Sequence, residues 1–228
     1  MNKAGLTDKA LVVLSGGQDS TTCLYWAIKR FGQDKVSSVS FDYGQRHRIE
    51  LTCAREVAAK AGVANVCLPI DTFAALGGDA LTDASIDVSG EKDVQTDLPI
   101  TFVPGRNLIF LTYAAAYAYR RDIHHLVTGV SQTDYSGYPD CRETTIEALQ
   151  QSIELGMDVQ MQIHTPLMHR SKKETVELAV ELGALDAMAL THTCYNGRRP
   201  PCKTCAACEL RASGFEEAGV RDPLLDIG

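Results

Sequence analysis

The sequence lacks any apolar run close to the roughly 20 residues that a membrane-spanning helix needs. Its longest apolar stretch, residues 108–119, fits a buried helix instead. Residues 1–8 also lack the apolar core of a secretion signal. We therefore expect a cytoplasmic protein with no membrane partner, in a compartment that keeps its eight cysteines reduced.

Positive charge is scarce as well. Lysine and arginine total 22 against 29 acidic residues, which gives a formal net charge of −7. A protein that holds a long nucleic acid usually presents a basic surface, so we expect a small-molecule substrate and no nucleic-acid partner. Apolar residues make up 45% of the chain and charged residues 22%, as in ordinary globular proteins. A chain of 228 residues can fold without disulfide bonds.

Strand-like and helix-like segments alternate along the chain. Apolar segments at 10–14, 36–41, 65–70 and 125–130 predict strands, and 159–165 predicts a further extended segment. Helical periodicity is found at 20–31, 47–61, 107–121, 141–155 and 171–182, the last with Ser171 and Glu174 as a capping box. This alternation predicts an α/β fold with a doubly wound parallel sheet.

Two segments break the alternation. Residues 71–103 contain Gly-Gly, Pro and several Asp and Thr residues, and we interpret them as an excursion or lid. Past Thr191 the composition shifts to Cys, Pro and Arg. We therefore divide the chain into a nucleotide-binding α/β domain, residues 1–190, and a small metal-binding helical appendage, residues 191–228.

A glycine loop follows the first predicted strand and opens the first helix. Glycine lets the backbone approach an anion, and a helix N-terminus presents free N–H groups to it. The loop has neither the lysine of a Walker A motif nor the G-x-G-x-x-G spacing of a dinucleotide site. The plainer alternative is a structural strand–turn–helix joint. The residues assigned to this anion site are Leu14, Ser15, Gly16, Gly17, Gln18, Asp19, Ser20, Thr21, Thr22, Cys23 and Leu24.

Asp19 is unusual beside a bound polyphosphate, because both are negative. Its carboxylate can help to hold Mg²⁺ or can cap the helix through backbone N–H groups. The sequence leaves both roles open.

Four cysteines gather near the C-terminus in the pattern C-x7-C-x2-C-x2-C: Cys194, Cys202, Cys205 and Cys208. Four thiolates can form a tetrahedral structural zinc site, and we expect one zinc per chain. An iron–sulfur cluster is the main alternative, although the C-x3-C-P continuation of ferredoxin-type motifs is absent.

Three further polar and aromatic segments, 41–47, 101–107 and 129–142, adjoin the predicted strands or helices. Strand-end loops meet at one rim of a doubly wound sheet. Tyr135 and Tyr138 can stack on a flat ring, while Asp134 and Asp140 can accept hydrogen bonds from its N–H groups. Each loop taken alone could be merely solvated. Together they predict a site for a planar, guanine-like anion.

The pattern resembles known proteins at two levels. Residues 15–20, Ser-Gly-Gly-Gln-Asp-Ser, resemble the pyrophosphate loop of the ATP pyrophosphatase superfamily. The segments at 42–47, 103–107 and 134–142, with the four cysteines, resemble the 7-cyano-7-deazaguanine synthase family of the queuosine pathway. The resemblance spans residues 10–220 and implies an adenine nucleotide alpha hydrolase-like fold.

The resemblance also implies an activity, that of a carbon–nitrogen ligase. It would convert 7-carboxy-7-deazaguanine, ammonia and ATP with Mg²⁺ to 7-cyano-7-deazaguanine, and we expect a homodimer. Asp19, Arg106 and Lys172 would serve catalysis. Candidate substrate-binding residues are Tyr43, Gln45, Arg106, Asn107, Asp134, Tyr135, Tyr138, Asp140 and Arg142. A tRNA-thiolating or tRNA-amidating member of the superfamily and a non-enzymatic zinc-knuckle module remain as alternatives.

Overall fold

A computed structural model of the chain describes residues 6–45, 47–73, 81, 98–133 and 137–226. Asp134 and Tyr135, two of the candidate substrate-binding residues, lie outside the described residues. Most of the predicted lid, residues 71–103, also lies outside them.

The core is a five-stranded parallel sheet in the order β3-β2-β1-β4-β5. The chain first builds outward from β1 and then returns to its other side, so the direction of winding reverses between β1 and β4. This confirms the predicted doubly wound α/β fold. The strands are β1 (Ala10–Val13), β2 (Val36–Asp42), β3 (Ala64–Pro69), β4 (His125–Val127) and β5 (Gln162–His164).

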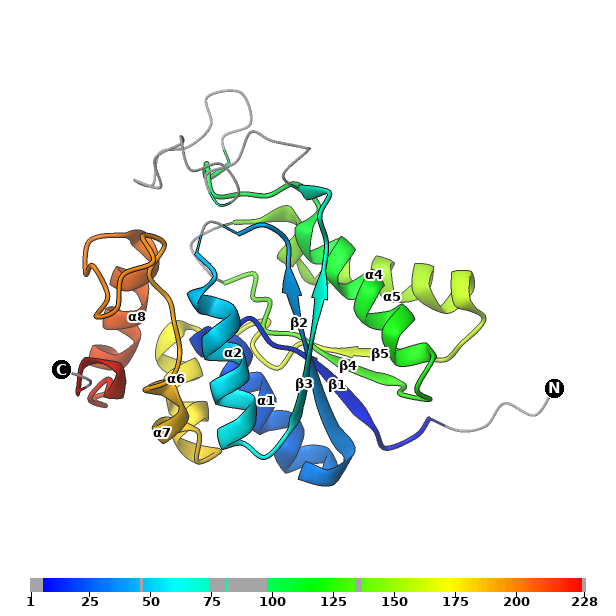
Figure 1. Ribbon diagram of the computed structural model, residues 1–228, viewed down its shortest axis with the longest axis horizontal. Coiled ribbons are helices and arrows are strands. Elements are labelled where there is room, and N and C mark those ends of the chain that lie inside the picture. The colour runs from blue at the N-terminus through cyan, green and yellow to red at the C-terminus, as the bar shows by residue number, and fades with distance from the viewer. Residues whose placement is uncertain (1–5, 46, 74–80, 82–97, 134–136, 227–228) are drawn as a thin grey trace.

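Helices cover both faces of this sheet (Figure 1). Strand β1 is buried on both sides: Val12 packs with the helices of one face and Leu11 with those of the other. Each such side chain contributes about 1.5–3 kcal/mol through removal from water. One face carries α1 (Gln18–Phe31) and α2 (Ile49–Lys60), with α6 (Lys172–Glu181) and α7 (Leu185–Met188) packed beyond α1, and the other carries α4 (Arg106–Tyr119) and α5 (Glu143–Met157).

Several boundaries differ from the sequence-based prediction. Strand β4 ends at Val127, three residues before the predicted end at residue 130. Thr128 still donates a backbone hydrogen bond to His164, and the chain then leaves the sheet. The capping box at α6 is confirmed: Ser171 Oγ accepts a hydrogen bond from Glu174 N, and Ser171 N donates to Glu174 Oε2.

The C-terminal segment packs closely on the rest of the chain through α8 (Ala206–Glu217). A Cβ atom added at Gly214 would lie 2.9 Å from Lys172 Cβ, so α8 and α6 approach each other at this glycine. The buried Arg211 guanidinium pairs with Asp222, at 2.6 Å and 2.8 Å, and donates to the Met188 carbonyl. The predicted division into two domains at residue 190 stays a prediction.

Short 3-10 turns occur at Gln33–Lys35, Pro139–Cys141 and Pro223–Asp226. Among the helices in the described part of the chain, each is too short or too polar to traverse a bilayer.

Gly16 and Gly17, adjacent in the loop after β1, differ in their conformational demands. Gly16 has φ +86°, and a Cβ there would lie 2.4 Å from the Glu50 carbonyl oxygen and 2.7 Å from Ala54 N. Gly17 has φ −86° and ψ 171°, an extended conformation open to any residue. Its added Cβ would make only ordinary contacts at 3.5 Å.

We predict that Gly16→Ala lowers the free energy of unfolding by about 3 kcal/mol or more, through backbone strain and the clash with α2. Gly17→Ala should cost no more than about 1 kcal/mol, the ordinary effect of alanine at a helix N-cap. Urea denaturation of both variants measures this. Equal losses in the two variants would contradict the assigned packing.

Candidate functional site

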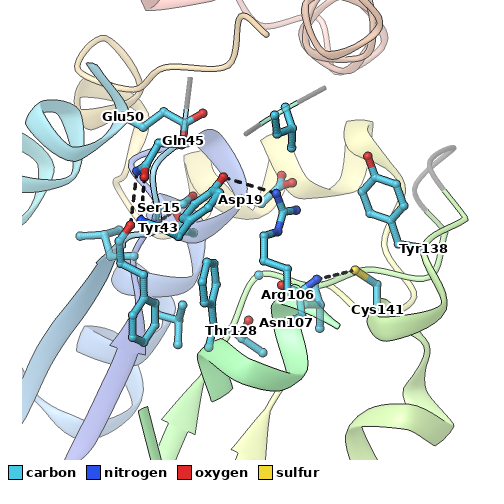
Figure 2. A pocket seen from close by; sticks show the side chains of 18 of the residues that line it. Ser15, Asp19, Tyr43, Gln45, Glu50, Arg106, Asn107, Thr128, Tyr138 and Cys141 are labelled. Carbon is cyan, nitrogen blue, oxygen red and sulfur yellow. Dashed lines mark hydrogen bonds between the residues drawn. The ribbon is translucent and has the colours of Figure 1, made fainter. Parts of the chain in front are cut away.

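A cavity of about 290 Å³ opens at the carboxyl ends of β1, β2 and β4. It includes the point where the winding of the sheet reverses, the usual ligand position in open α/β folds. Figure 2 shows the cavity and the side chains that line it. The predicted site residues that line it are Leu14, Ser15, Asp19, Ser20, Tyr43, Gln45, Arg106, Asn107 and Tyr138.

The loop after β1 holds its shape through its own hydroxyls. Ser15 Oγ and Ser20 Oγ are 3.0 Å apart, and Ser20 Oγ donates to the Gly17 carbonyl at 3.2 Å. Thr21 is fully buried, and its hydroxyl donates to the same carbonyl at 2.8 Å. The structure therefore directs the Thr21 hydroxyl to the helix backbone and not to the cavity. The predicted residues of this stretch that do not line the cavity are Gly16, Gly17, Gln18, Thr21, Thr22, Cys23 and Leu24.

Asp19 and Lys172 form an ion pair across 153 residues of sequence. Lys172 Nζ lies 2.7 Å from Asp19 Oδ2 and joins the start of α6 to the first turn of α1. The N-cap of α1 is Gly17, without a side-chain capping bond, so Asp19 does not cap this helix. Its other oxygen, Oδ1, is buried and has no hydrogen-bond partner among the described residues. One carboxylate oxygen is thus available for a ligand.

At the end of β2, Gln45 braces the turn that presents Tyr43. Gln45 Oε1 accepts from Tyr43 N at 2.9 Å, and Gln45 Nε2 donates to the Phe41 carbonyl at 3.3 Å. The Tyr43 ring contacts Phe110 and receives a hydrogen bond on its hydroxyl from Arg106 Nη1 at 3.5 Å. The cavity therefore has an aromatic wall beside a guanidinium group.

Arg106 begins α4 and is drawn between Tyr43 and Asn107 in Figure 2. Burial by itself lowers the pKa of its guanidinium, but the neighbouring Tyr43, Tyr138 and Asp140 outweigh burial and raise that pKa. Arg106 is therefore a permanent cation in the cavity wall, the only one among the described lining residues.

The candidate residues of the 129–142 segment have different placements. Asp140 is 4% exposed and does not line the cavity; its Oδ2 accepts from Asn107 N at 2.9 Å and from Asn107 Nδ2 at 3.1 Å. This carboxylate fixes the start of α4. Arg142 is exposed at the N-cap of α5. Tyr138 lines the cavity, and its hydroxyl is 2.6 Å from Thr101 Oγ1. Asp134 and Tyr135 lie outside the described residues.

Sequence reasoning missed several cavity residues, among them Glu50 and Tyr195. Glu50, in the first turn of α2, resembles any acidic residue at a helix start, yet its side chain lines the cavity. Burial raises the pKa of its carboxyl to about 7, against the opposing effect of Arg106. Tyr195 follows Cys194 directly and reaches the cavity from the C-terminal segment, where it lines the wall together with Tyr138. Burial raises the pKa of the Tyr195 hydroxyl.

The four C-terminal cysteines converge as predicted. Their Sγ atoms all lie within 4.8 Å of one another, so Cys194, Cys202, Cys205 and Cys208 form a candidate metal site. A tetrahedron of thiolates at Zn–S distances of about 2.3 Å has edges of about 3.8 Å, close to this arrangement. Hydrogen bonds from Thr204 and Asn196 lower the pKa of the Cys202 thiol to about 5, which favours the thiolate that a metal requires.

The sequence matches a described family over almost its whole length. The family of queuosine biosynthesis protein QueC matches residues 9–219. The chain belongs to this family. It is 67% identical to a 7-cyano-7-deazaguanine synthase of Chromobacterium violaceum over 228 residues, covering 99% of this chain and 96% of that protein. The enzyme of the same name from Laribacter hongkongensis is 63% identical over 96% of this chain and 95% of its own length.

A solved structure supports the fold. The structure of a predicted subunit of tRNA methyltransferase from Methanocaldococcus jannaschii superposes with a TM-score of 0.50 at 20% identity. The match covers 76% of this chain and 74% of that one. At this identity the similarity concerns the fold alone.

We predict about one metal ion per chain in the purified protein, lost in Cys205→Ser. Metal-binding energy is also folding energy at such a site, so the variant should unfold at a lower temperature. Elemental analysis and thermal denaturation measure the two effects. Cys67→Ser is the matched control, because Cys67 is an exposed thiol on β3 away from the cluster. A Cys205→Ser protein with full metal content would contradict the assigned site.

Proposed function

We propose that this chain is a carbon–nitrogen ligase that converts 7-carboxy-7-deazaguanine, ammonia and ATP to 7-cyano-7-deazaguanine in queuosine biosynthesis. One observation carries the proposal: a single cavity brings the Ser15–Asp19–Ser20 loop together with Arg106 and an aromatic wall. The loop side suits a polyphosphate and the other side suits a flat anion. Membership of this family and the names of the two similar enzymes agree with this assignment.

The chemistry needs both sides of the cavity. A carboxylate is a poor electrophile and its oxygen a poor leaving group, and transfer of a phosphoryl or adenylyl group from ATP corrects both. Ammonia then forms the new C–N bond while the activated C–O bond breaks, giving an amide. A second activation of the amide oxygen allows it to leave, with loss of the remaining N–H protons, to give the nitrile. Close placement of the two reactants supplies much of the rate enhancement.

The loop is suited to the phosphate part of this reaction. The N-terminus of α1 presents backbone N–H groups at the cavity, and Ser15 and Ser20 add hydroxyls. These fixed dipoles stabilise charge that develops on a transferring group without reorganisation. The predicted ATP residues that lie behind the cavity wall would act through the loop backbone.

The Asp19 carboxylate is suited to bind Mg²⁺. Its Oδ1 is buried without a hydrogen-bond partner among the described residues, and Mg²⁺ prefers carboxylate oxygens. When bound, Mg²⁺ would neutralise phosphate charge. Lys172, held by Asp19 Oδ2 at 2.7 Å, keeps this carboxylate in a fixed orientation and brings a positive charge to the phosphate side.

Arg106 is placed to bind the carboxylate of the substrate. Its charge is permanent, and the Tyr43 ring and hydroxyl hold its guanidinium. Asn107 and Tyr138 lie beside it in the cavity wall. Arginine also suits this position because its planar N–H fork matches a carboxylate.

We further propose that the four-cysteine site holds zinc, because four thiolates at tetrahedral spacing are typical of structural zinc. The alternative iron–sulfur cluster would give a coloured protein. The cytoplasm, where thiols remain reduced, suits this site. A homodimer is supported by exposed apolar side chains on α4 and α5, Tyr113, Tyr119 and Leu155.

The first prediction of this assignment is the reaction itself. Incubation of the purified protein with ATP, Mg²⁺, ammonia and 7-carboxy-7-deazaguanine should yield 7-cyano-7-deazaguanine by mass spectrometry, and omission of any one component should abolish it. The protein should be colourless and contain zinc. Absence of the nitrile with all components present and the metal site filled would refute the assignment.

The second prediction distinguishes the role of Asp19 in Mg²⁺ binding from the role of Lys172 in ATP binding. Asp19→Asn should raise the Mg²⁺ concentration for half-maximal turnover at least about tenfold. Loss of a group that supports a metal ion usually lowers metal affinity by about that factor or more. Lys172→Met should raise KM for ATP with a smaller change in the Mg²⁺ requirement. Asp34→Asn, in an exposed turn, is the control. If both variants show the same loss with unchanged Mg²⁺ dependence, the pair is only structural.

A further inference from the structure

Specific recognition of a guanine-like base requires a hydrogen-bond acceptor on the protein that faces the pyrimidine edge of the base. That edge carries a ring N–H beside an exocyclic amino group, two donors that point the same way. Asp140, one of the two acceptors expected from the sequence, is unsuited to this task. Its Oδ2 already accepts two hydrogen bonds from Asn107, its Oδ1 contacts Cys141 Sγ, and it does not line the cavity.

The cavity offers a different carboxylate. Among the described residues that line it, only Asp19 and Glu50 are acidic. Asp19 belongs to the phosphate loop and is paired with Lys172. Glu50 projects from the first turn of α2 on the same side of the cavity as Gln45 and Tyr43 (Figure 2). Its carboxylate has no hydrogen-bond or ion-pair partner among the described residues, so both of its oxygens are available.

Glu50 and Arg106 have opposite charges in one cavity but form no salt bridge with each other. Both side chains are partly buried, and a ligand that pairs with each of them would offset the water that each loses in the cavity. The proposed substrate has this polarity, with two N–H donors on its pyrimidine edge and a carboxylate on its five-membered ring. Tyr43, Phe110 and Tyr195 give the cavity flat apolar surfaces against which the ring system can pack.

We propose that Glu50 reads the base: its two carboxylate oxygens accept the ring N–H and the exocyclic amino group of the deazaguanine, while Arg106 binds the substrate carboxylate. The inference rests on the proposed function and adds a specificity-determining residue to it. A site whose acceptor pairs with two N–H donors of the ligand discriminates against ligands that lack one of them. The acceptor is then left without a full set of hydrogen bonds.

The electrostatics of Glu50 agree with this role. Burial raises the pKa of its carboxyl to about 7 in the ligand-free protein, so near pH 7 its neutral and ionised forms are present in comparable amounts. Two N–H donors stabilise the ionised form, which lowers the pKa again when the base binds. Recognition and ionisation are therefore coupled at one side chain.

The test compares 7-carboxy-7-deazaguanine with the analogue that lacks the exocyclic amino group, in the wild type and in Glu50→Ala. The wild type should prefer the parent acid by about 100-fold in kcat/KM, since hydrogen bonds to charged groups are among the stronger ones. In Glu50→Ala this preference should fall to within about threefold, and KM for ammonia and ATP should change by no more than about threefold. If turnover of the variant is too slow, calorimetric affinities of the two acids give the same ratio.

Two further variants serve as a conservative substitution and as a control for charge. Glu50→Gln has nearly the same shape but turns an N–H donor toward the base, so it should lose the preference as well, even if Glu50→Ala folds poorly. Glu147→Ala, an exposed residue on α5, removes the same charge and should keep the wild-type preference.

The outcomes separate this inference from the function on which it rests. If the wild type forms no nitrile and binds neither acid, the proposed function fails. If the wild type is active and both Glu50 variants keep the preference for the parent acid, Glu50 does not read the base. An unchanged preference with a raised KM for ammonia would overturn the inference too and would place ammonia at Glu50.

Discussion

The fixed position of the loop after β1 is the constraint on which the rest of the site depends. Gly16 lies so close to α2 that a Cβ would meet the Glu50 and Ala54 backbone, and its carbonyl accepts a hydrogen bond from His192 N at 2.9 Å. From the other side Gly129, after β4, approaches Asp19 and Ser20 within 3.1 Å of an added Cβ. Three distant parts of the chain thus hold one turn, and each also supplies or adjoins the cavity wall. Loop position and cavity shape are set by the same contacts.

The charges of the site are arranged by that framework. On the phosphate side Asp19 and Lys172 neutralise each other across two helices. In the cavity Arg106 and Glu50 remain apart, held by the first turns of α4 and α2. Here α2 and α4 lie on opposite faces of the same sheet, so the two charges enter the cavity from separate layers of the fold.

Local signals accounted for the features that the sequence predicted correctly. The apolar segment at β1, the glycines after it, the capping box at Ser171 and the spacing of the four cysteines each depend on neighbouring residues, and the structure confirms them. The placement of Glu50 and Tyr195 in the cavity, and the contact by which Asp140 fixes the start of α4, could not be predicted in this way. Each depends on which distant group lies near the side chain: Arg106 for Glu50, Tyr138 for Tyr195 and Asn107 for Asp140. In sequence, an acid that lines a cavity and an acid that faces water at a helix start look the same.

Tyr195 gives the metal site a consequence beyond fold stability. The residue directly after the first cysteine of the cluster lines the cavity, as Tyr138 does. The geometry around the metal and the outline of the cavity therefore belong to one rigid unit. Only one peptide bond separates the first cysteine of the cluster from a side chain that shapes the cavity. The cysteine cluster and the cavity wall are thus neighbours in sequence as well as in space.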